Sequence, residues 1–276
     1  MINRYGHKKD REGGGADHRR PEGRRAREEW IYGLNPVLEA IRSGRKIKSV
    51  FLSRSRREGL AGIEEELRSR GIALKKADPF FFDSRFPKGH QGIAAAVAPR
   101  EYADLDAMLE IPSQRSEPPF FLVLDCVEDP RNFGAILRTA DAGGVHGVVI
   151  QSHRSAALVP EAVKASAGAA EHIPVAMVAN IKNAIRDMKE MGLLIVGAEA
   201  GADRAVWDVD LAGPLALVVG SEGKGLRKTV REDCDMLASL PMKGKVGSLN
   251  VSVAAGVMIY EITHQRIRAK GREFKV

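Results

Sequence analysis

Two segments of this chain place polar and charged side chains directly after apolar runs, in types and at spacings that could do chemistry. The first segment, 126–144, contains Asn132 and Arg138, which are six residues apart and therefore close to two helical turns. The second, 220–226, reads GSEGKGL and has Glu222 as its single acid among three glycines. An amide, a guanidinium group and a carboxylate that share a cleft could orient a hydroxyl or a phosphate.

A third segment, 241–256, follows another apolar run and contains Ser248, Asn250 and Ser252. Each segment taken alone also fits a simpler interpretation. Asn132, Asn250 and Ser252 are residue types that cap helix N-termini, and a glycine-rich stretch is often only a tight turn. Because three polar loops each follow an apolar element, the pattern as a whole favours a shared site.

The order of the glycines in 220–226 excludes two common phosphate-binding motifs. Their order is G-x-x-G-x-G, which matches neither the G-x-x-x-x-G-K-[ST] frame nor the G-x-G-x-x-G dinucleotide fingerprint. Three glycines in this short stretch still permit positive φ angles and a close approach of the backbone to a ligand.

The elements that must position these loops alternate along the chain from residue 120 onward. Strands are expected at 120–125, 147–150, 173–178, 193–200 and 215–220, and a further apolar run lies at 235–242. Helices are expected at 133–144, 160–169, 180–192 and 250–268. This alternation predicts an α/β fold, a parallel sheet covered by helices on both faces, with the polar loops at its carboxyl edge.

The last of these helices has an apolar face, made of Val251, Ala254, Ala255, Met258 and Ile262. That face fits equally well in the core of the same chain or against a partner chain.

The region 29–100 is predicted to form a small α/β domain of its own. Asn35 and Pro36 are typical of an N-cap and a first helical position. The three phenylalanines at 80–82 are expected to pack in a core. Strands are expected at 47–52, 72–77 and 92–98, and a second helix at 59–71. The polar, proline-containing stretch 101–119 is expected to be a linker to a second domain at 120–276.

Charge is divided unevenly between these regions. The chain has 276 residues and a formal net charge of +7, from 43 Lys and Arg against 36 Asp and Glu. Residues 1–28 hold nine basic and five acidic residues and have no apolar face, which predicts a disordered basic tail. Residues 29–100 hold fourteen and eight, whereas residues 101–265 hold fifteen and twenty-two. A basic tail beside a basic domain suits a polyanion such as RNA, although the tail alone also fits a solvated terminus.

Composition excludes several classes of protein. No apolar run approaches the roughly 18–20 residues that span a bilayer. The charged start lacks the apolar core of a secretory signal, so a soluble, cytoplasmic protein with no membrane contact is expected. Only Cys126 and Cys234 are present, which excludes a disulfide framework and a multi-cysteine zinc site, and no metal is expected.

The three segments together resemble a known family. The motifs N-F-G-A-I-L-R-T-A, G-S-E-G-K-G-L and P-M-x-G-x-V-x-S-L-N-V-S-V-A-A are similar to the signature motifs of the SpoU (TrmH-type) family of RNA ribose 2′-O-methyltransferases, within the SPOUT superfamily. The resemblance covers 120–268. The stretches W-I-Y-G-L-N-P-V-L-E-A-I and H-Q-G-I-A resemble the substrate-binding domain of the subgroup that modifies a guanosine of bacterial 23S ribosomal RNA.

This resemblance implies a fold detail and a cofactor that periodicity does not reveal. In the family the carboxyl-terminal part of the domain forms a deep trefoil knot, the SPOUT α/β knot, and binds S-adenosylmethionine among the knot loops. Carried over position by position, the backbone groups that hold the cofactor belong to Gly220, Leu240 and Leu249. Family members are homodimers, so a homodimer is expected.

The resemblance also implies site residues for transfer of a methyl group to a ribose 2′-hydroxyl. Arg138 contacts the target ribose or its phosphate and is a proposed base in the family. A guanidinium group stays protonated in proteins, so we expect Arg138 to orient the phosphate and stabilise the developing alkoxide. Asn132, Glu222 and Asn250 match the other polar positions, and Ser248 is a plausible fourth. Glu222 could hold either Arg138 or Asn132 in place.

The sequence therefore predicts a methyltransferase that acts on a guanosine of 23S ribosomal RNA. The same transfer to tRNA is the nearest alternative, and the separate N-terminal domain disfavours it. A non-catalytic RNA-binding relative is expected to lack Arg138 or Asn250, and this chain has both. A small-molecule methyltransferase is the weakest alternative because it would have no use for the basic N-terminal domain.

Overall fold

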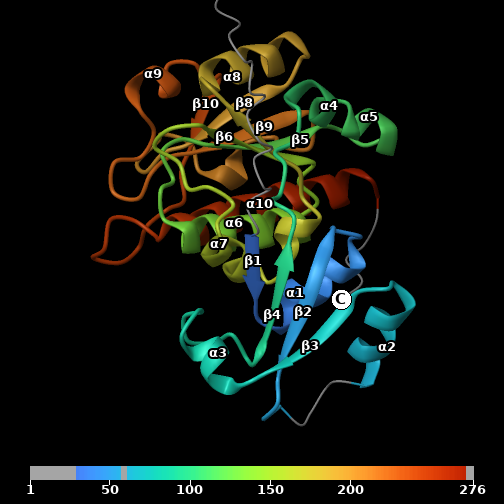
Figure 1. Cartoon of the computed structure of the whole chain (residues 1–276). Coiled ribbons are helices and arrows are strands. Elements are labelled where there is room, and N and C mark those ends of the chain that lie inside the picture. The colour runs from blue at the N-terminus through green and yellow to red at the C-terminus, as the bar shows by residue number, and fades with distance from the viewer. Residues whose placement is uncertain (1–28, 57–60, 272–276) are drawn as a thin grey trace, which may run out of the picture.

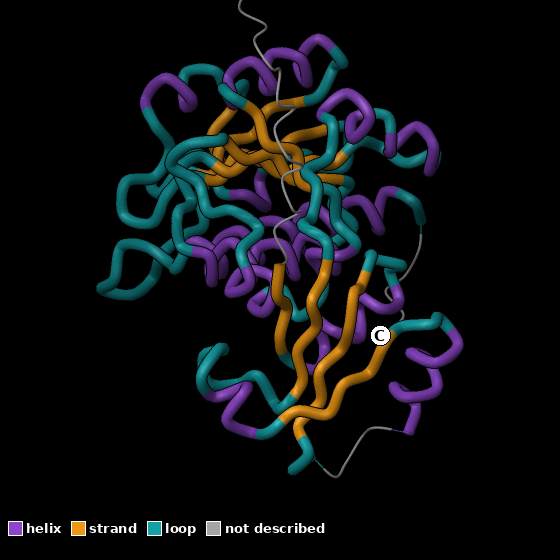
Figure 2. Tube along the Cα trace, viewed as in Figure 1, coloured by secondary structure: helices purple, strands orange, loops and turns teal. Residues whose placement is uncertain are grey.

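A computed structural model describes residues 29–56 and 61–271 of the chain (Figure 1). The predicted basic tail 1–28 lies outside the described residues. The described chain forms two units, each built on its own sheet (Figure 2). The small unit carries four strands and the large unit carries six.

The large sheet is wholly parallel, as the alternating pattern predicts. Its strands are β5 (Phe120–Leu124), β6 (Gly147–Gln151), β7 (Val175–Val178), β8 (Leu194–Ala198), β9 (Leu215–Val219) and β10 (Met236–Ala238). They lie in the order β10-β8-β9-β5-β6-β7. The chain moves outward from β5 through β7 and then crosses to the other side, so the strand order reverses between β5 and β9. Ligand sites of open α/β sheets lie at such a point.

Helices cover both faces of this sheet (Figure 1). They are α6 (Pro130–Ala142), α7 (Pro160–Ala165), α8 (Ile181–Glu190), α9 (Lys228–Arg231) and α10 (Val251–Ala269), with 3-10 turns η1 (Ala169–Glu171) and η2 (Val206–Asp208). Helices α6, α7 and α10 lie on one face, and α8 and α9 on the other. In β5, Leu122 and Leu124 pack toward α6, whereas Phe121 and Val123 pack toward α8. Side chains of a strand alternate between faces, so the continuous apolar run serves both layers.

The apolar face of α10 belongs mainly to the core of its own chain. Val251, Ala255, Met258 and Ile262 are buried beside α6, whereas Ala254 is only partly buried. Of the two interpretations of that face, the structure supports packing within the chain.

The segment 101–119, predicted to be a linker, contains regular structure. Helices α4 (Leu105–Leu109) and α5 (Ile111–Arg115) lie here, and Met108 and Leu109 are buried in the core layer beneath α8. The segment is polar overall, so its composition did not indicate that Met108 and Leu109 would be buried. It therefore forms part of the packing of the large unit rather than an extended connection.

The small unit has strands β1 (Glu29–Tyr32), β2 (Ile47–Ser53), β3 (Ala73–Ala77) and β4 (Ile93–Val97), with helices α1 (Leu34–Arg42), α2 (Ala61–Ser69) and α3 (Pro79–Asp83). Its strand order is β1-β4-β2-β3, and only β2 and β3 are parallel. The short strand β1 is absent from the prediction because four residues show no usable periodicity. The prediction of Asn35 as an N-cap is also wrong: Gly33 occupies that position, with φ at 97°, and Asn35 lies inside α1.

The two units share one continuous hydrophobic cluster and a buried ionic contact. Glu171 of η1 accepts from Arg45 at 2.7 Å and from Arg100 at 3.0 Å. The Glu171 side chain is 1% exposed, so both of its oxygens are used and the carboxylate is not left unpaired. Removing one partner of such a buried pair leaves an uncompensated charge, and this contact therefore fixes the small unit against the large one.

A buried histidine makes the stability of the large unit depend on pH. His146 accepts from the Phe120 amide at its Nδ1 atom, 3.2 Å away, so its Nε2 atom carries the proton and donates to Glu117 at 3.1 Å. Burial lowers the pKa of His146 below its ordinary value of 6.5, although Glu117 acts in the opposite direction. The unfolded chain therefore binds a proton at a higher pH than the folded chain does.

We expect the free energy of unfolding to fall as the pH decreases below about 6.5, because protons then favour the unfolded state. Urea unfolding of the wild type and of His146→Gln between about pH 7.5 and 5.5 checks this. Glutamine cannot titrate, so the midpoint of the variant should change less over this range. Identical pH profiles for the two proteins would contradict the assignment.

Among the described residues, no helix is long and apolar enough to cross a membrane.

Candidate functional site

The three polar segments meet at the carboxyl edge of the large sheet, as their positions after apolar runs predict. The loop after β5 leads into α6, the glycine-rich loop follows β9, and the loop after β10 leads into α10. Strands β5 and β9 are direct neighbours, and β8 separates β9 from β10. Parallel strands end at the same edge, so residues more than 100 positions apart in sequence reach one place.

Asn132, Glu222 and Asn250 form a hydrogen-bonded cluster at this edge. The Asn132 Nδ2 atom donates to Glu222 Oε2 at 3.2 Å. The Asn250 Nδ2 atom donates to Asn132 Oδ1 at 3.0 Å and lies 3.4 Å from Glu222 Oε1. Each of the three segments thus supplies one member, and the carboxylate fixes the orientation of both amides.

Helix capping explains why the two asparagines behave differently. Asn250 is the N-cap of α10, and its Oδ1 atom accepts from the amide and the hydroxyl of Ser252. The prediction of Asn132 as an N-cap is wrong, because Asp129 caps α6 and accepts from the amides of Arg131 and Asn132. Since an aspartate performs the capping, the Asn132 side chain is available for Glu222.

Arg138 lies two turns further along α6 and is exposed. It makes no hydrogen bond or ion pair with any residue in the described part of the chain. Of the two roles considered for Glu222, the structure shows the contact with Asn132 and none with Arg138. The Arg138 guanidinium group is therefore available to an external anion.

A cavity of about 330 Å³, which we call the rear cavity, lies between the glycine-rich loop and the start of α10. Gly220, Leu240, Leu249 and Ser248 all line it, and so does Glu222. The Ser248 hydroxyl makes no hydrogen bond within the described residues. Val219 and Met258 contribute to the apolar part of its wall. Four residues predicted from the resemblance, three for the cofactor and Ser248, thus share one apolar cavity with a few polar groups, as small-molecule sites do.

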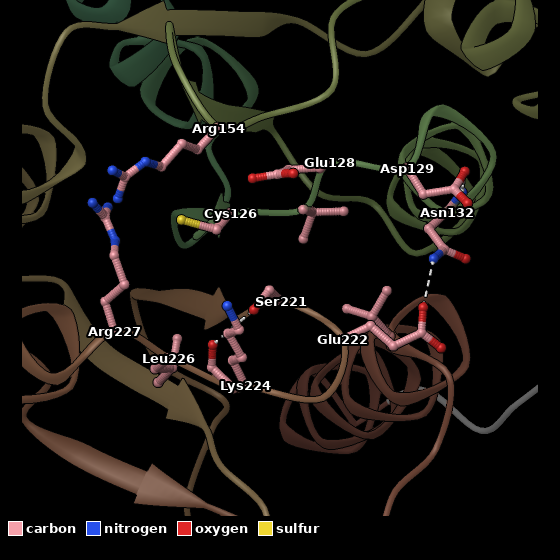
Figure 3. Close-up of a pocket in the computed structure, with 13 residues that line it drawn as sticks. Cys126, Glu128, Asp129, Asn132, Arg154, Ser221, Glu222, Lys224, Leu226 and Arg227 are labelled. Carbon is pink, nitrogen blue, oxygen red and sulfur yellow. Dashed lines mark hydrogen bonds between the residues drawn. The ribbon is translucent and has the colours of Figure 1, made fainter.

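A second cavity, of about 730 Å³, lies in front of the cluster (Figure 3). The two cavities share four lining residues, which are Ser221, Glu222, Gly225 and Val251. Figure 3 shows the Arg154 and Arg227 side chains toward one end of the front cavity and the Asn132–Glu222 contact toward the other. The front cavity is more polar than the 330 Å³ rear cavity. The Asn132–Glu222–Asn250 cluster therefore lies between a largely apolar cavity and a charged one.

A buried ion pair that sequence reasoning missed anchors the glycine-rich loop. Asp125, at the end of β5, is fully buried and accepts from the Arg227 amide at 2.8 Å and from its Nε atom at 2.5 Å. Arg227 also donates to Gln151 at 2.8 Å. Arg227 therefore ties the end of the loop to β5 and β6. The sequence did contain a signal for this ion pair: Asp125 directly follows five apolar residues, and an acid buried at such a position needs a cationic or hydrogen-bonding partner.

In the described part of the chain, no three His, Cys, Asp or Glu side chains are grouped so that they could hold a metal ion. The trefoil knot that the resemblance implies stays a prediction.

Two family models match this chain. The model of the SpoU rRNA Methylase family matches residues 119–260, which is more than half of the chain. The model of the RNA 2′-O ribose methyltransferase substrate-binding domain matches residues 30–103. These ranges correspond to the large and small units.

Individual relatives match over nearly their whole length. YacO of Bacillus subtilis, named as a TrmH-family tRNA/rRNA methyltransferase, is 44% identical over 239 residues, 86% of this chain and 96% of YacO. The 23S rRNA (guanosine-2′-O-)-methyltransferase RlmB of Yersinia pestis is 43% identical, over 86% of this chain and 98% of RlmB. The SpoU methyltransferase AviRb of Streptomyces viridochromogenes, solved with its cofactor AdoMet, has a TM-score of 0.73 at 29% identity, over 88% of this chain and 92% of AviRb. The chain therefore belongs to the SpoU (TrmH-type) family of RNA 2′-O-methyltransferases.

Proposed function

We propose that this protein transfers a methyl group from S-adenosylmethionine to the ribose 2′-hydroxyl of a guanosine in 23S ribosomal RNA. The observation that carries the proposal is the pair of adjoining cavities that share Glu222. One contains the residues predicted for the cofactor, and the other is open and charged. Such an arrangement suits two reactants that meet at a boundary.

The rear cavity fits the cofactor by its chemistry. Its wall offers apolar side chains and the glycine-rich backbone, and Gly220, Leu240 and Leu249 would hold S-adenosylmethionine there. When bound, this cofactor supplies an activated methyl group on a sulfonium centre. The protein then has to align the acceptor hydroxyl and stabilise the charge that develops on it.

The chain's own residues would perform these two tasks. Asn132 and Asn250 present oriented amide groups at the boundary, and Glu222 holds both of them. The Ser248 hydroxyl, without a partner in the described structure, would donate to or accept from a bound group. Arg138 would contact the phosphate beside the target ribose and stabilise negative charge on the 2′-oxygen.

The substrate part of the proposal rests on RlmB and on the small unit. RlmB is named for a guanosine of 23S rRNA, and it matches this chain across both units. The proposed site of action is the cytoplasm, where ribosomal RNA is processed.

Methyl transfer from labelled S-adenosylmethionine to ribosomal RNA and to tRNA, each from a strain that lacks the gene, tests the proposal. Mapping of the labelled nucleotide should give a guanosine of 23S rRNA. Label in tRNA alone would favour the tRNA alternative, and label in neither RNA would favour a non-catalytic RNA-binding role.

We further propose that the protein is a homodimer whose interface includes an exposed stripe of α10. The stripe consists of Val253, Val257 and Tyr260, which are 50%, 41% and 48% exposed. They recur at i, i+4 and i+7 and therefore lie along one side of the helix, opposite the face that packs in the core. Apolar stripes of this kind mark association surfaces, and a second copy of the chain would cover it.

Val257→Asp should convert the dimer to a monomer, because a carboxylate buried at the interface would have no partner. Sedimentation at micromolar concentration measures the change. Met191→Asp provides the control, since Met191 is also exposed and apolar but lies at the end of α8. A wild type that sediments as a monomer, or a Val257→Asp variant that stays dimeric, would contradict this interface.

A further inference from the structure

A third cavity, of about 400 Å³, lies where the small unit meets α7, away from the two cavities of the catalytic edge. The small unit contributes five of its lining residues, and the start of α7 contributes Pro160 and Glu161. Strand β1 contacts α7 here, as Figure 1 also shows. The five residues from the small unit are Trp30, Tyr32, Arg85, Phe86 and Pro87.

The walls of this cavity are flat rings. Phe86 stacks on Tyr32 with ring centres 5.4 Å apart and also contacts Trp30 at 5.7 Å. Pro87 and Pro160 add two further ring surfaces. Aromatic and proline rings exclude water from a planar group, and nucleobases stack on aromatic side chains irrespective of sequence.

Polar groups in the cavity are few, and one of them lacks a partner. Tyr32 is 3% exposed as a whole residue, and its hydroxyl, which is not among the fully buried polar atoms, makes no hydrogen bond within the described residues. Tyr32 lines the cavity, and a hydroxyl that has no partner in the protein is available to water or to a ligand there. Arg85 and Glu161 are exposed side chains at the cavity and add one donor group and one acceptor group.

Contacts between the two units hold this cavity together. Lys164 of α7 donates to the Lys88 carbonyl at 3.0 Å, and its ammonium group lies 4.9 Å from the centre of the Tyr32 ring. Burial raises the pKa of Tyr32, the charge of Glu161 adds to this rise, and the charge of Arg131 opposes it. Arg131 directly precedes Asn132 of the amide–carboxylate cluster. The charge of Arg131 therefore acts on the Tyr32 hydroxyl from the first turn of α6.

We propose that the cavity between β1 and α7 binds one unstacked nucleobase of the RNA substrate. The rings enclose the base, Glu161 accepts a hydrogen bond from an exocyclic amino group, and the Tyr32 hydroxyl bonds a second polar atom. Guanine, cytosine and adenine carry such an amino group, whereas uracil does not. The inference rests on the proposed function, because it assumes an RNA substrate.

Tryptophan fluorescence can report on this cavity directly. The chain has two tryptophans, and Trp207 lies on η2, far from it in sequence and 52% exposed. In Trp207→Phe, the remaining fluorescence comes from Trp30 at the cavity wall. Titration with short single-stranded RNA should change this fluorescence saturably, and oligocytidylate should bind more tightly than oligouridylate. An RNA that binds without changing the Trp30 signal would overturn the proposal.

Glu161→Gln gives the sharper test, because its two possible effects have opposite signs. The substitution removes a negative charge, so a purely electrostatic effect would strengthen RNA binding. The amide oxygen of glutamine can still accept from the amino group, but the bond loses its charge-assisted part, so binding of oligocytidylate should instead weaken by roughly fivefold to tenfold. Tyr32→Phe should weaken it by about fivefold. Glu190→Gln removes the same charge at the exposed end of α8 and serves as the matched control.

The methyl-transfer assay separates this inference from the proposed function. In Glu161→Gln the KM for RNA should rise while kcat and the affinity for S-adenosylmethionine stay unchanged. If the wild type transfers no methyl group, the proposed function fails and the fluorescence titration still tests the cavity. If transfer is normal and Glu161→Gln leaves the KM unchanged or lowers it, the base-binding proposal is wrong.

Discussion

Arg138→Ala should reduce methyl transfer to RNA by about 10²–10³-fold, the range observed when one group that stabilises transition-state charge is removed. Arg138 is exposed, and its side chain has no partner in the described structure, so its loss removes no contact within the chain. Its effect should therefore fall on the substrate and the reaction. Transfer to the RNA, measured with saturating S-adenosylmethionine, is the assay.

The cofactor should still bind Arg138→Ala with nearly unchanged affinity, because Arg138 does not line the rear cavity. Calorimetric titration with S-adenosylmethionine measures this separately from transfer. Arg131→Ala is a suitable comparison, since Arg131 is an exposed arginine on the first turn of the same helix. A loss of cofactor affinity in Arg138→Ala would show that Arg138 acts on the cofactor and not on the RNA substrate.

Gly220→Ala should abolish binding of S-adenosylmethionine and lower the stability of the fold. A Cβ atom at this position would collide with the backbone of Gly225 and Leu226, which belong to the same glycine-rich loop. Backbone atoms cannot rotate away as a side chain can, so the loop would have to shift. Overpacking of this kind costs about 1–3 kcal/mol. The shifted loop would also move Glu222 away from Asn132 and Asn250.

Gly247→Ala is the matched control for that substitution. Gly247 lines the same cavity, but a Cβ atom there would meet no other atom within 4 Å. Calorimetry with S-adenosylmethionine and thermal unfolding should show losses in Gly220→Ala and nearly wild-type values in Gly247→Ala. Equal cofactor affinity in the two variants would show that the close contact at Gly220 does not shape the cavity.

The ion pair between Asp125 and Arg227 holds the end of the glycine-rich loop. It explains how the amide–carboxylate cluster can keep one arrangement although its members are partly or fully exposed. Asp125 and Arg227 join the end of the loop to the centre of the sheet, and Arg227 also reaches Gln151. The loop is thus held at β9 on one side and at Arg227 on the other. Glu222, which lies between these two points, can then orient both amides.

The sequence by itself determined the class of the large unit and the location of its candidate site. Six apolar runs and the helices between them are local patterns, and such periodicity depends only on which faces a strand or helix buries. Because the sheet is parallel, the loops after β5, β9 and β10 had to share an edge. For this reason Asn132, Glu222 and Asn250 were predictable as neighbours before any contact was known.

Only the tertiary structure decided which of these groups bond to one another. Asp129, rather than Asn132, caps α6, and this choice depends on the path of the chain into the helix. The pairing of Glu222 with Asn132, and of Asp125 with Arg227, joins residues about 90 and 100 positions apart. The cavity between β1 and α7 likewise depends on how two units dock. Local patterns carry no information on such contacts, because packing between distant segments sets them.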